Sequence, residues 1–269
     1  MGSTSTTFNK KYRLRMYVDE LYNPQGDGGN LVFSIQVNAY GKAGEVMSNG
    51  TKVATQLLKG VGTTGAIDTS DSEQTFITGT DPNNYIWCSG KLWRAISIDS
   101  SDNSVKLVTQ WNISTISYNE ERNTAFEGSY MQQWLNDTTV DGFLGNLRDY
   151  EKFIKTDSVW DATLTTANTK PAKTAMVTSA VGLLNIYEYT MSYNGTTYSN
   201  GYLNNGLVWW TLTPYNTSSV CFMFGSGTAN YGDSTNPRGV RPTFNLKSNV
   251  VITSGDGTKE NPFEVKLAS

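Results

Sequence analysis

The residues that could carry out acid–base or nucleophilic chemistry are few and scattered in this sequence. The chain contains no histidine, which removes Ser-His-Asp and Cys-His hydrolases, HExxH zinc enzymes and most imidazole acid–base schemes. The two cysteines, Cys88 and Cys221, lie far apart in the chain, so they form neither a dense disulfide framework nor a clustered metal site. They are interpreted as two buried thiols or, alternatively, as a single disulfide.

Carboxylates remain as possible catalytic groups. Glu120, Glu121 and Glu151 have other charged residues beside them, a pattern typical of solvated surface charges. A carboxylate pair suited to sugar hydrolysis stays open, because spatial separation cannot be read from sequence positions. Residues 256–261 offer oxygen ligands but lack the stepped acidic spacing of an EF-hand, which favours a turn over a calcium site. We therefore expect no catalytic residue, no metal and no cofactor.

The composition indicates which elements position these residues. Of 269 residues, 38% are hydrophobic and only 17% are charged. Asn, Thr, Ser, Gly and Tyr fill the difference, which favours strands, turns and uncharged hydrogen-bonding surfaces over amphipathic helices. The net charge of −3 gives no basic footprint for nucleic acid. No apolar stretch is long enough to span a membrane.

The order of elements predicts an α+β fold. Residues 1–7 are interpreted as an added leader, residues 8–45 as a β-hairpin left from an upstream β domain, and residues 46–80 as a connecting segment. Strands expected at 85–88, 92–99 and 105–109 form an antiparallel meander. Two helices follow, one capped by Ser129 and one carrying an apolar stripe at Val140, Phe143, Leu144 and Leu147. Strands return from residue 207 onward.

Four ordered motifs resemble a known family. They are Asn84-Tyr85-Ile86-Trp87 with Leu92-Trp93-Arg94; Trp134-Leu135-Asn136; Trp210-Thr211-Leu212-Thr213-Pro214-Tyr215-Asn216; and Gly239-Val240-Arg241-Pro242, followed by Ser254 to Phe263. Together they resemble exported bacterial modules of unknown function with a C-type-lectin-like fold, similar to the variable receptor proteins of diversity-generating retroelements. The formylglycine-generating enzyme shares that fold, but its chemistry needs a C-terminal cysteine pair that this chain lacks. The resemblance implies a C-type-lectin-like domain over residues 81–262, with a tail at 263–269.

The framework residues of these motifs are expected to pack. Trp87, Trp93 and Trp210 should fill the core, as should Trp134, because large aromatic side chains supply apolar area where Leu and Ile are few. Arg241 should brace neighbouring carbonyls through its five donors.

The segment between residues 215 and 236 is small and polar, interrupted by aromatics. Its only charged residue is Asp233, and Tyr, Ser, Asn and Gly are typical of adaptable binding loops. In variable proteins of the resembled fold, the corresponding strands and loops contact ligand. That resemblance implies these ligand-binding residues: Tyr215, Asn216, Ser218, Ser219, Cys221, Phe222, Phe224, Ser226, Asn230, Tyr231 and Asp233. The alternative is an ordinary hairpin with a polar loop.

The sequence therefore predicts a ligand-binding or adhesion module displayed at the cell surface. Its expected partner is a protein or glycan ligand on another cell surface, with no nucleic acid, and with a membrane only through an anchor absent from this sequence. Two alternatives stay open: a carbohydrate-active or amide-cleaving enzyme on the same scaffold, and a structural spacer of a surface fibre.

Overall fold

Strands dominate the computed structural model, which describes residues 50–166, 168–193 and 198–267. These residues form sixteen strands, four short α-helices and two short 3-10 helices. The predicted leader at 1–7 and hairpin at 8–45 lie outside the described residues.

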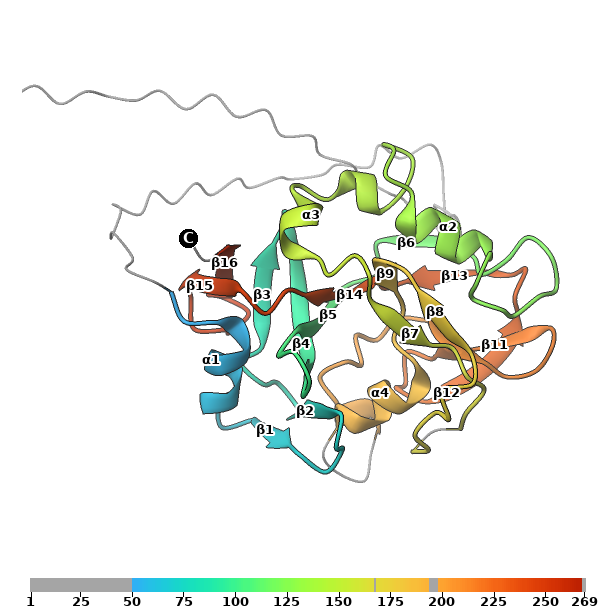
Figure 1. Cartoon of the computed structure of the whole chain (residues 1–269). Coiled ribbons are helices and arrows are strands. Elements are labelled where there is room, and N and C mark those ends of the chain that lie inside the picture. The colour runs from blue at the N-terminus through green and yellow to red at the C-terminus, as the bar shows by residue number, and fades with distance from the viewer. Residues whose placement is uncertain (1–49, 167, 194–197, 268–269) are drawn as a thin grey trace, which may run out of the picture. The chain divides into compact units, whose positions relative to one another are not determined.

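Nine strands form the larger sheet (Figure 1). Its order is β15-β16-β3-β4-β5-β14-β9, while β2 also pairs with β4, and β1 pairs with β2. The strands are β1 (Gly65–Asp68), β2 (Gln74–Gly79), β3 (Tyr85–Cys88), β4 (Lys91–Asp99), β5 (Val105–Thr109), β9 (Val181–Gly182), β14 (Thr243–Leu246), β15 (Val250–Ser254) and β16 (Phe263–Leu267).

The meander β3-β4-β5 agrees with the sequence prediction. Ser89 and Gly90 connect β3 to β4 with φ values of 52° and 75°. Two consecutive positive φ values are what a two-residue hairpin turn with the right strand twist requires. Ile86 pairs with Trp93, and Trp93 in turn pairs with Thr109, so the three strands lie in antiparallel register.

The segments on either side of the predicted domain are part of the larger sheet. Residues 50–79, expected to be a connecting segment, contain α1 (Val53–Lys59), β1 and β2, and β2 pairs with β4. Residues 263–267, expected to be a tail, form β16, which pairs in parallel with β3 through Phe263 and Ile86. Apolar alternation in Phe263-Glu264-Val265 is the signal for this strand, and Phe263 is buried.

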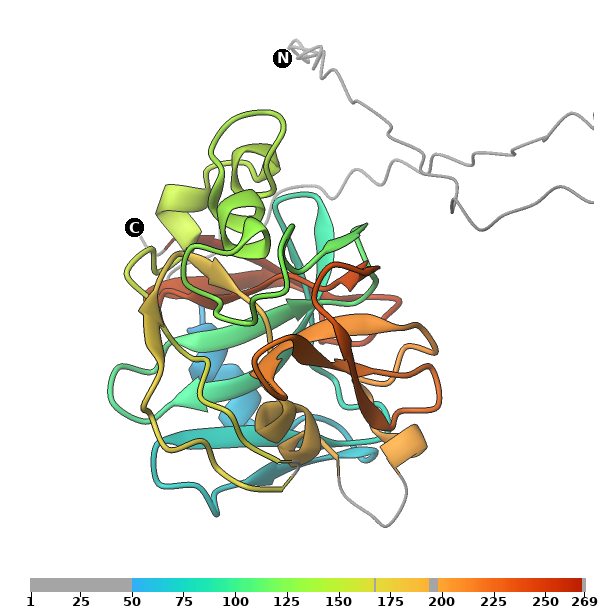
Figure 2. The same ribbon diagram turned by 90° about the vertical axis from the view of Figure 1, so that its right-hand side faces the viewer.

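A second sheet has the order β12-β11-β10-β13-β6. Its strands are β6 (Ser114–Ser117), β10 (Trp209–Pro214), β11 (Ser219–Met223), β12 (Ala229–Asp233) and β13 (Pro237–Val240). The separate ribbon consists of β7 (Val159–Asp161) and β8 (Met176–Thr178). In Figure 2, β10 to β12 are orange, on the right of the view.

The helices are short and lie in the connections. Besides α1 they are α2 (Tyr130–Asn136), η1 (Leu144–Asn146), α3 (Tyr150–Phe153), α4 (Ile186–Met191) and η2 (Tyr198–Asn200). Ser129 caps α2 as predicted, accepting a hydrogen bond from the Gln132 backbone N–H at 3.0 Å. The predicted second helix is replaced by the single turn η1. Val140 is exposed, while Phe143, Leu144 and Leu147 pack in the core from irregular backbone.

The predicted α+β class is wrong. Strands account for 36% of the structure and helices for 14%, so the fold is β-rich, and the C-type-lectin-like architecture implied by the resemblance is not retained. The error has a physical origin: the apolar stripe from Val140 fits a helix, yet Gly142 and Gly145 contact backbone of residues 137–139 so closely that a side chain there would clash. Such close turns interrupt helices.

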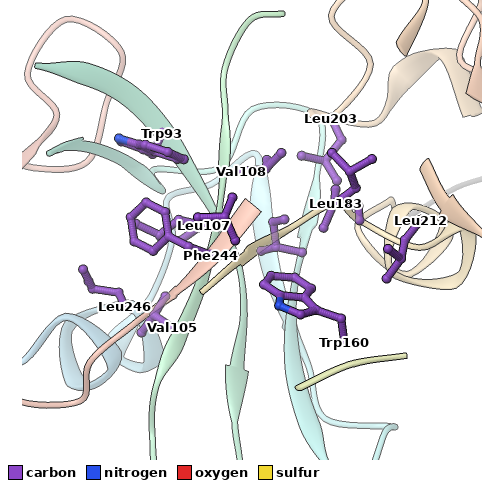
Figure 3. Close-up of a cluster of buried hydrophobic side chains, with 14 of the residues drawn as sticks. Trp93, Val105, Leu107, Val108, Trp160, Leu183, Leu203, Leu212, Phe244 and Leu246 are labelled. Carbon is purple, nitrogen blue, oxygen red and sulfur yellow. The ribbon is translucent and has the colours of Figure 1, made fainter. Parts of the chain in front are cut away.

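The core contains side chains of the larger sheet together with side chains from β10 of the second sheet and from β7 (Figure 3). The ring of Trp93 packs against Phe244 on β14, with ring centroids 4.5 Å apart. Trp93 and Trp210 are fully buried as predicted, and Trp134 is partly buried at the edge of the core. The core prediction is wrong for Trp87, whose side chain is 45% exposed: in β3, its neighbours Ile86 and Cys88 face inward instead.

Candidate functional site

The predicted binding residues gather on one β-hairpin and the strand end beside it. Tyr215 and Asn216 follow β10, Ser218 to Phe222 lie in or next to β11, and Asn230 to Asp233 belong to β12. The paired register of Cys221 with Tyr231 and of Phe222 with Asn230 brings the two strands together. Six of the predicted residues are exposed, and together we call them the hairpin face: Tyr215, Asn216, Phe224, Ser226, Asn230 and Tyr231. Tyr231 shares a side of the hairpin with Cys221, whereas Asn230 shares the other side with Phe222.

Two tyrosines form the centre of the hairpin face. The rings of Tyr215 and Tyr231 are stacked, with centroids 3.6 Å apart and planes 5° from parallel. Tyr215 is 46% exposed and Tyr231 is 49% exposed. Hydrogen bonding with Tyr231 raises the pKa of the Tyr215 hydroxyl, so the Tyr215 phenol stays neutral near pH 7.

Two of the predicted residues are buried instead. Phe222 and Cys221 are 3% and 5% exposed, because β11 is covered on both faces. On one face the guanidinium of Arg238 lies 3.6 Å from the centre of the Phe222 ring and 5.0 Å from that of Trp210. On the other, burial raises the pKa of the Cys221 thiol to about 11. Neither side chain can contact a ligand directly. Both residues therefore belong to the buried framework of the hairpin and not to its binding surface.

The polar members of the set fix the turns. Asn216 Oδ1 accepts hydrogen bonds from the backbone N–H groups of Ser218 and Ser219, at 2.9 and 2.8 Å. Asp233 pairs with Arg122 at 2.8 Å, and hydrogen bonds from the Thr235 backbone and hydroxyl lower the pKa of its carboxyl. Asp233 is therefore occupied within the protein, and the hairpin face itself is uncharged.

Arg241 takes the bracing role that the sequence predicted. Its Nε donates to the Thr109 carbonyl at 2.9 Å, and Nη1 donates to the Leu203 carbonyl at 2.6 Å. The guanidinium also lies 4.8 Å from the centre of the Trp209 ring. Arg241 thus links β5, the loop that contains Leu203, and β10.

A cavity of about 580 Å³ lies elsewhere, between the larger sheet, the β7-β8 ribbon and α4. Its walls include Gln74, Ser97, Lys106, Trp160, Glu188 and Asn245. Lys106 and Glu188 form an ion pair in this wall, with side chains 12% and 3% exposed. Trp160 lies beside the Lys106 ammonium, 5.2 Å from ring centre to Nζ.

Four carboxylates line the cavity, but each is held by the protein. Glu188 also completes a capping box with Asn185 at the start of α4. Glu73 pairs with Lys170 and Lys173, and these hydrogen bonds lower its pKa. Asp99 and Asp161 accept hydrogen bonds from nearby turns.

Sequence reasoning missed this cavity entirely. One signal was present: Asn185 followed three residues later by Glu188 is the pattern of a capping box. Its companion Lys106 lies between Val105 and Leu107 in an otherwise apolar strand, a position where a charged side chain must find a partner. Their meeting depends on contacts between residues far apart in the chain, which spacing alone does not provide.

The comparisons with known proteins identify a family. Residues 103–248, more than half of the chain, match the model described as a domain of unknown function (DUF6273). The chain belongs to this family. The DUF6273 region runs from the turn before β5 to the end of β14 and includes the whole hairpin face. No curated protein and no solved structure matches the chain, and the resemblance to retroelement variable proteins stays a prediction.

Other expectations about the chain concern thiols, metals and membranes. Cys88 and Cys221 are both buried free thiols, in β3 and β11, which favours the first of the two interpretations. Within residues 50–166, 168–193 and 198–267, no group of three or more Cys, Asp or Glu side chains is arranged to hold a metal ion. The helices in those same ranges are too short or too polar to cross a membrane.

Proposed function

We propose that this DUF6273 domain is a ligand-binding module and that the hairpin face is its recognition surface. The observation that carries the proposal is the exposed Tyr215–Tyr231 stack. Tyrosine offers a large, amphipathic contact area with few rotatable bonds, and such residues dominate the energetics of many interfaces. Here each ring restrains the other, so little side-chain entropy remains to be lost on binding.

The stack stands on a rigid base. Tyr231 pairs with Cys221 in register, and Cys221 belongs to the buried strand whose Phe222 packs edge-on against Trp210. Phe224, just after β11, is also exposed and packs against Phe222, so it adds a second aromatic contact on the Phe222 side of the hairpin. Rigid placement of exposed aromatics on a buried framework supports a binding role over a spacer role, which would need no such surface.

The hairpin face favours a partner recognised by shape and neutral hydrogen bonds. Its six residues carry no charge, so association gains little from electrostatic steering. Exposed tyrosine rings can pack against sugar rings or apolar protein side chains, and Asn216, Ser226 and Asn230 supply donors and acceptors elsewhere on the hairpin. The proposed partner is a protein or glycan on another cell surface, met by a domain displayed outside the cell.

The experiment compares the parent with the double variant Tyr215→Ser/Tyr231→Ser on an array of glycans and purified mucins. The control is Trp87→Ser, which removes an aromatic of nearly equal exposure from β3 in the other sheet. Loss of both tyrosines should weaken the parent's strongest interactions at least about tenfold, as expected for central aromatic contacts. The control should keep them. Equal affinity of the double variant and the parent for the same ligands would refute the proposal.

A further inference from the structure

One wall of the cavity between the larger sheet and α4 is a row of polar side chains, on a face where a sheet usually carries apolar ones. Ser97 on β4 pairs in register with Lys106 on β5, and Lys106 pairs with Asn245 on β14. Side chains of paired residues lie on the same face of a sheet. Gln74 on β2 joins the row, accepting a hydrogen bond from the Ser97 hydroxyl at 2.6 Å.

This row is partly shielded from solvent. Ser97 is almost fully buried, and Gln74, Lys106 and Asn245 are half-buried. Glu188 and Asn185 of α4 and Trp160 of β7 form the opposite wall. Burying polar side chains costs free energy that an apolar row would not, so four adjacent polar positions inside the molecule call for a reason beyond stability. The volume of about 580 Å³ falls within the range of roughly 300–1,000 Å³ typical of small-molecule sites.

All three lysines of the cavity are paired with carboxylates. Lys106 pairs with Glu188, and Lys170 and Lys173 both pair with Glu73. The two remaining carboxylates accept hydrogen bonds: Asp99 from the Ser101 backbone and hydroxyl, and Asp161 from the backbone N–H groups of Thr163 and Lys173. An anionic ligand would find no uncompensated lysine and would face four carboxylates. A cationic ligand would find only Asp99 and Asp161 without an ion-pair partner, and oxygens of both already accept hydrogen bonds from turns.

Uncharged donors and acceptors are what the walls still offer. The amides of Gln74, Asn185 and Asn245 and the hydroxyl of Ser97 carry both donors and acceptors. The Ser97 hydroxyl already donates to Gln74 Oε1, and Asn185 Oδ1 already accepts from the Glu188 N–H, so the amide NH₂ groups and the Ser97 oxygen are the groups offered to a ligand. Hydroxyl groups of a ligand need such two-way partners, and the ring of Trp160 and the side chains of Val159 and Met176 supply apolar area beside them.

From this combination we propose that the cavity binds a small, neutral, hydroxyl-rich molecule, a mono- or disaccharide. This site is separate from the hairpin face. Of the cavity's walls, only Leu212 belongs to the sheet that carries the hairpin face. The module therefore has two recognition sites, an exposed aromatic surface and a partly enclosed polar cavity.

The test is a heteronuclear NMR titration of the full chain with four neutral probes: maltose, lactose, N,N′-diacetylchitobiose and myo-inositol. Glucuronate and glucosamine serve as the anionic and cationic comparators. At least one neutral probe should shift the backbone amides of residues 97, 106 and 245, and the charged comparators should bind more weakly. Amides of the hairpin face should not move with them.

Two variants locate the binding. Asn245→Leu and Ser97→Ala each remove polar groups from the row, and each should weaken the neutral probe about tenfold, the effect of leaving a ligand hydroxyl without its partner. The control is Asn249→Leu, which makes the same replacement of Asn by Leu at an exposed position outside the cavity. This variant should bind the neutral probe as the parent does. Ser97→Ala carries the test if Asn245→Leu fails to fold, as judged by far-UV circular dichroism.

Three results would overturn the inference. They are the absence of shifts with every neutral probe at millimolar concentration, tighter binding of a charged comparator, and parent-like affinity of the folded cavity variants. Shifts confined to the hairpin face would also reject the cavity while leaving the proposed function in place. Conversely, tyrosine variants with unchanged array profiles would reject the hairpin face and leave the cavity.

Discussion

Replacing Lys106 by Met is expected to expose how much the fold depends on the ion pair in the cavity wall. Glu188 is 3% exposed, and its other oxygen accepts a hydrogen bond from the Asn185 backbone N–H at 3.0 Å. Lys106→Met keeps the length of the side chain but leaves the Glu188 carboxylate buried without its cation. Breaking a buried pair in this way costs about 3–5 kcal/mol, much more than the pair itself contributes.

The size of this loss in stability comes from the Glu188 charge that stays buried, and not from the contact with Lys106 that is lost. The double variant Lys106→Met/Glu188→Gln should therefore be more stable than Lys106→Met alone, because its neutral amide can still accept the capping hydrogen bond. For a domain of this size, about 3–5 kcal/mol corresponds to a fall in Tm of roughly 6–20 °C. The measurement is urea denaturation, followed by circular dichroism, of the parent, the two single variants Lys106→Met and Glu188→Gln, and the double variant.

A surface pair provides the control. Lys152 and Asp149 are 3.1 Å apart with both side chains more than half exposed, so Lys152→Met should cost less than about 1 kcal/mol. The reasoning is refuted if Lys106→Met loses no more stability than Lys152→Met, or if the double variant is no more stable than Lys106→Met.

Further predictions concern the core and the acid limb of the stability curve. Trp210 is fully buried, and its indole N–H donates to the Ile116 carbonyl at 3.2 Å; Trp210→Ala should cost about 3–5 kcal/mol, whereas exposed Trp87→Ala should change the urea midpoint little. Burial alone would raise the pKa of Asp71, but hydrogen bonds from Lys170, the backbone and Tyr187 outweigh it and lower that pKa. The stability from Asp71 is therefore present above its unfolded pKa of about 3.9 and lost as the pH falls through the lower folded value. Urea midpoints of Asp71→Asn and the parent should differ at neutral pH and converge below about pH 4; a constant difference would contradict this.

The sequence allowed local elements to be predicted where one pattern dominated. The meander from Tyr85 to Thr109 follows from strand alternation and from the Ser89-Gly90 turn, and the Ser129 cap of α2 follows from side-chain chemistry. Such features depend on neighbours in the chain, which a sequence displays directly.

The fold class and the burial of individual side chains were harder to predict, because both depend on contacts between residues far apart in the chain. The stripe at Val140 fits a helix, but close backbone contacts at Gly142 and Gly145 impose a turn. Phe222 was predicted to bind because it lies in a segment rich in small polar residues and aromatics, yet Arg238, sixteen positions further on, covers its ring. The polar row of the cavity comes from four strands, β2, β4, β5 and β14, and the last of these lies near the end of the chain, so only the register of the sheet reveals it.

The position of β16 between β15 and β3 has a consequence for biosynthesis. β3 is among the first strands of the described chain to leave the ribosome, yet its neighbour on one side is the last. Until residues 263–267 emerge, the edge of β3 opposite β4 lacks that partner, and unpaired strand edges invite association with other chains. Pairing between such distant segments also closes a long loop, which slows folding. The nascent domain is therefore expected to depend on chaperones or on post-translational folding for as long as that edge is open.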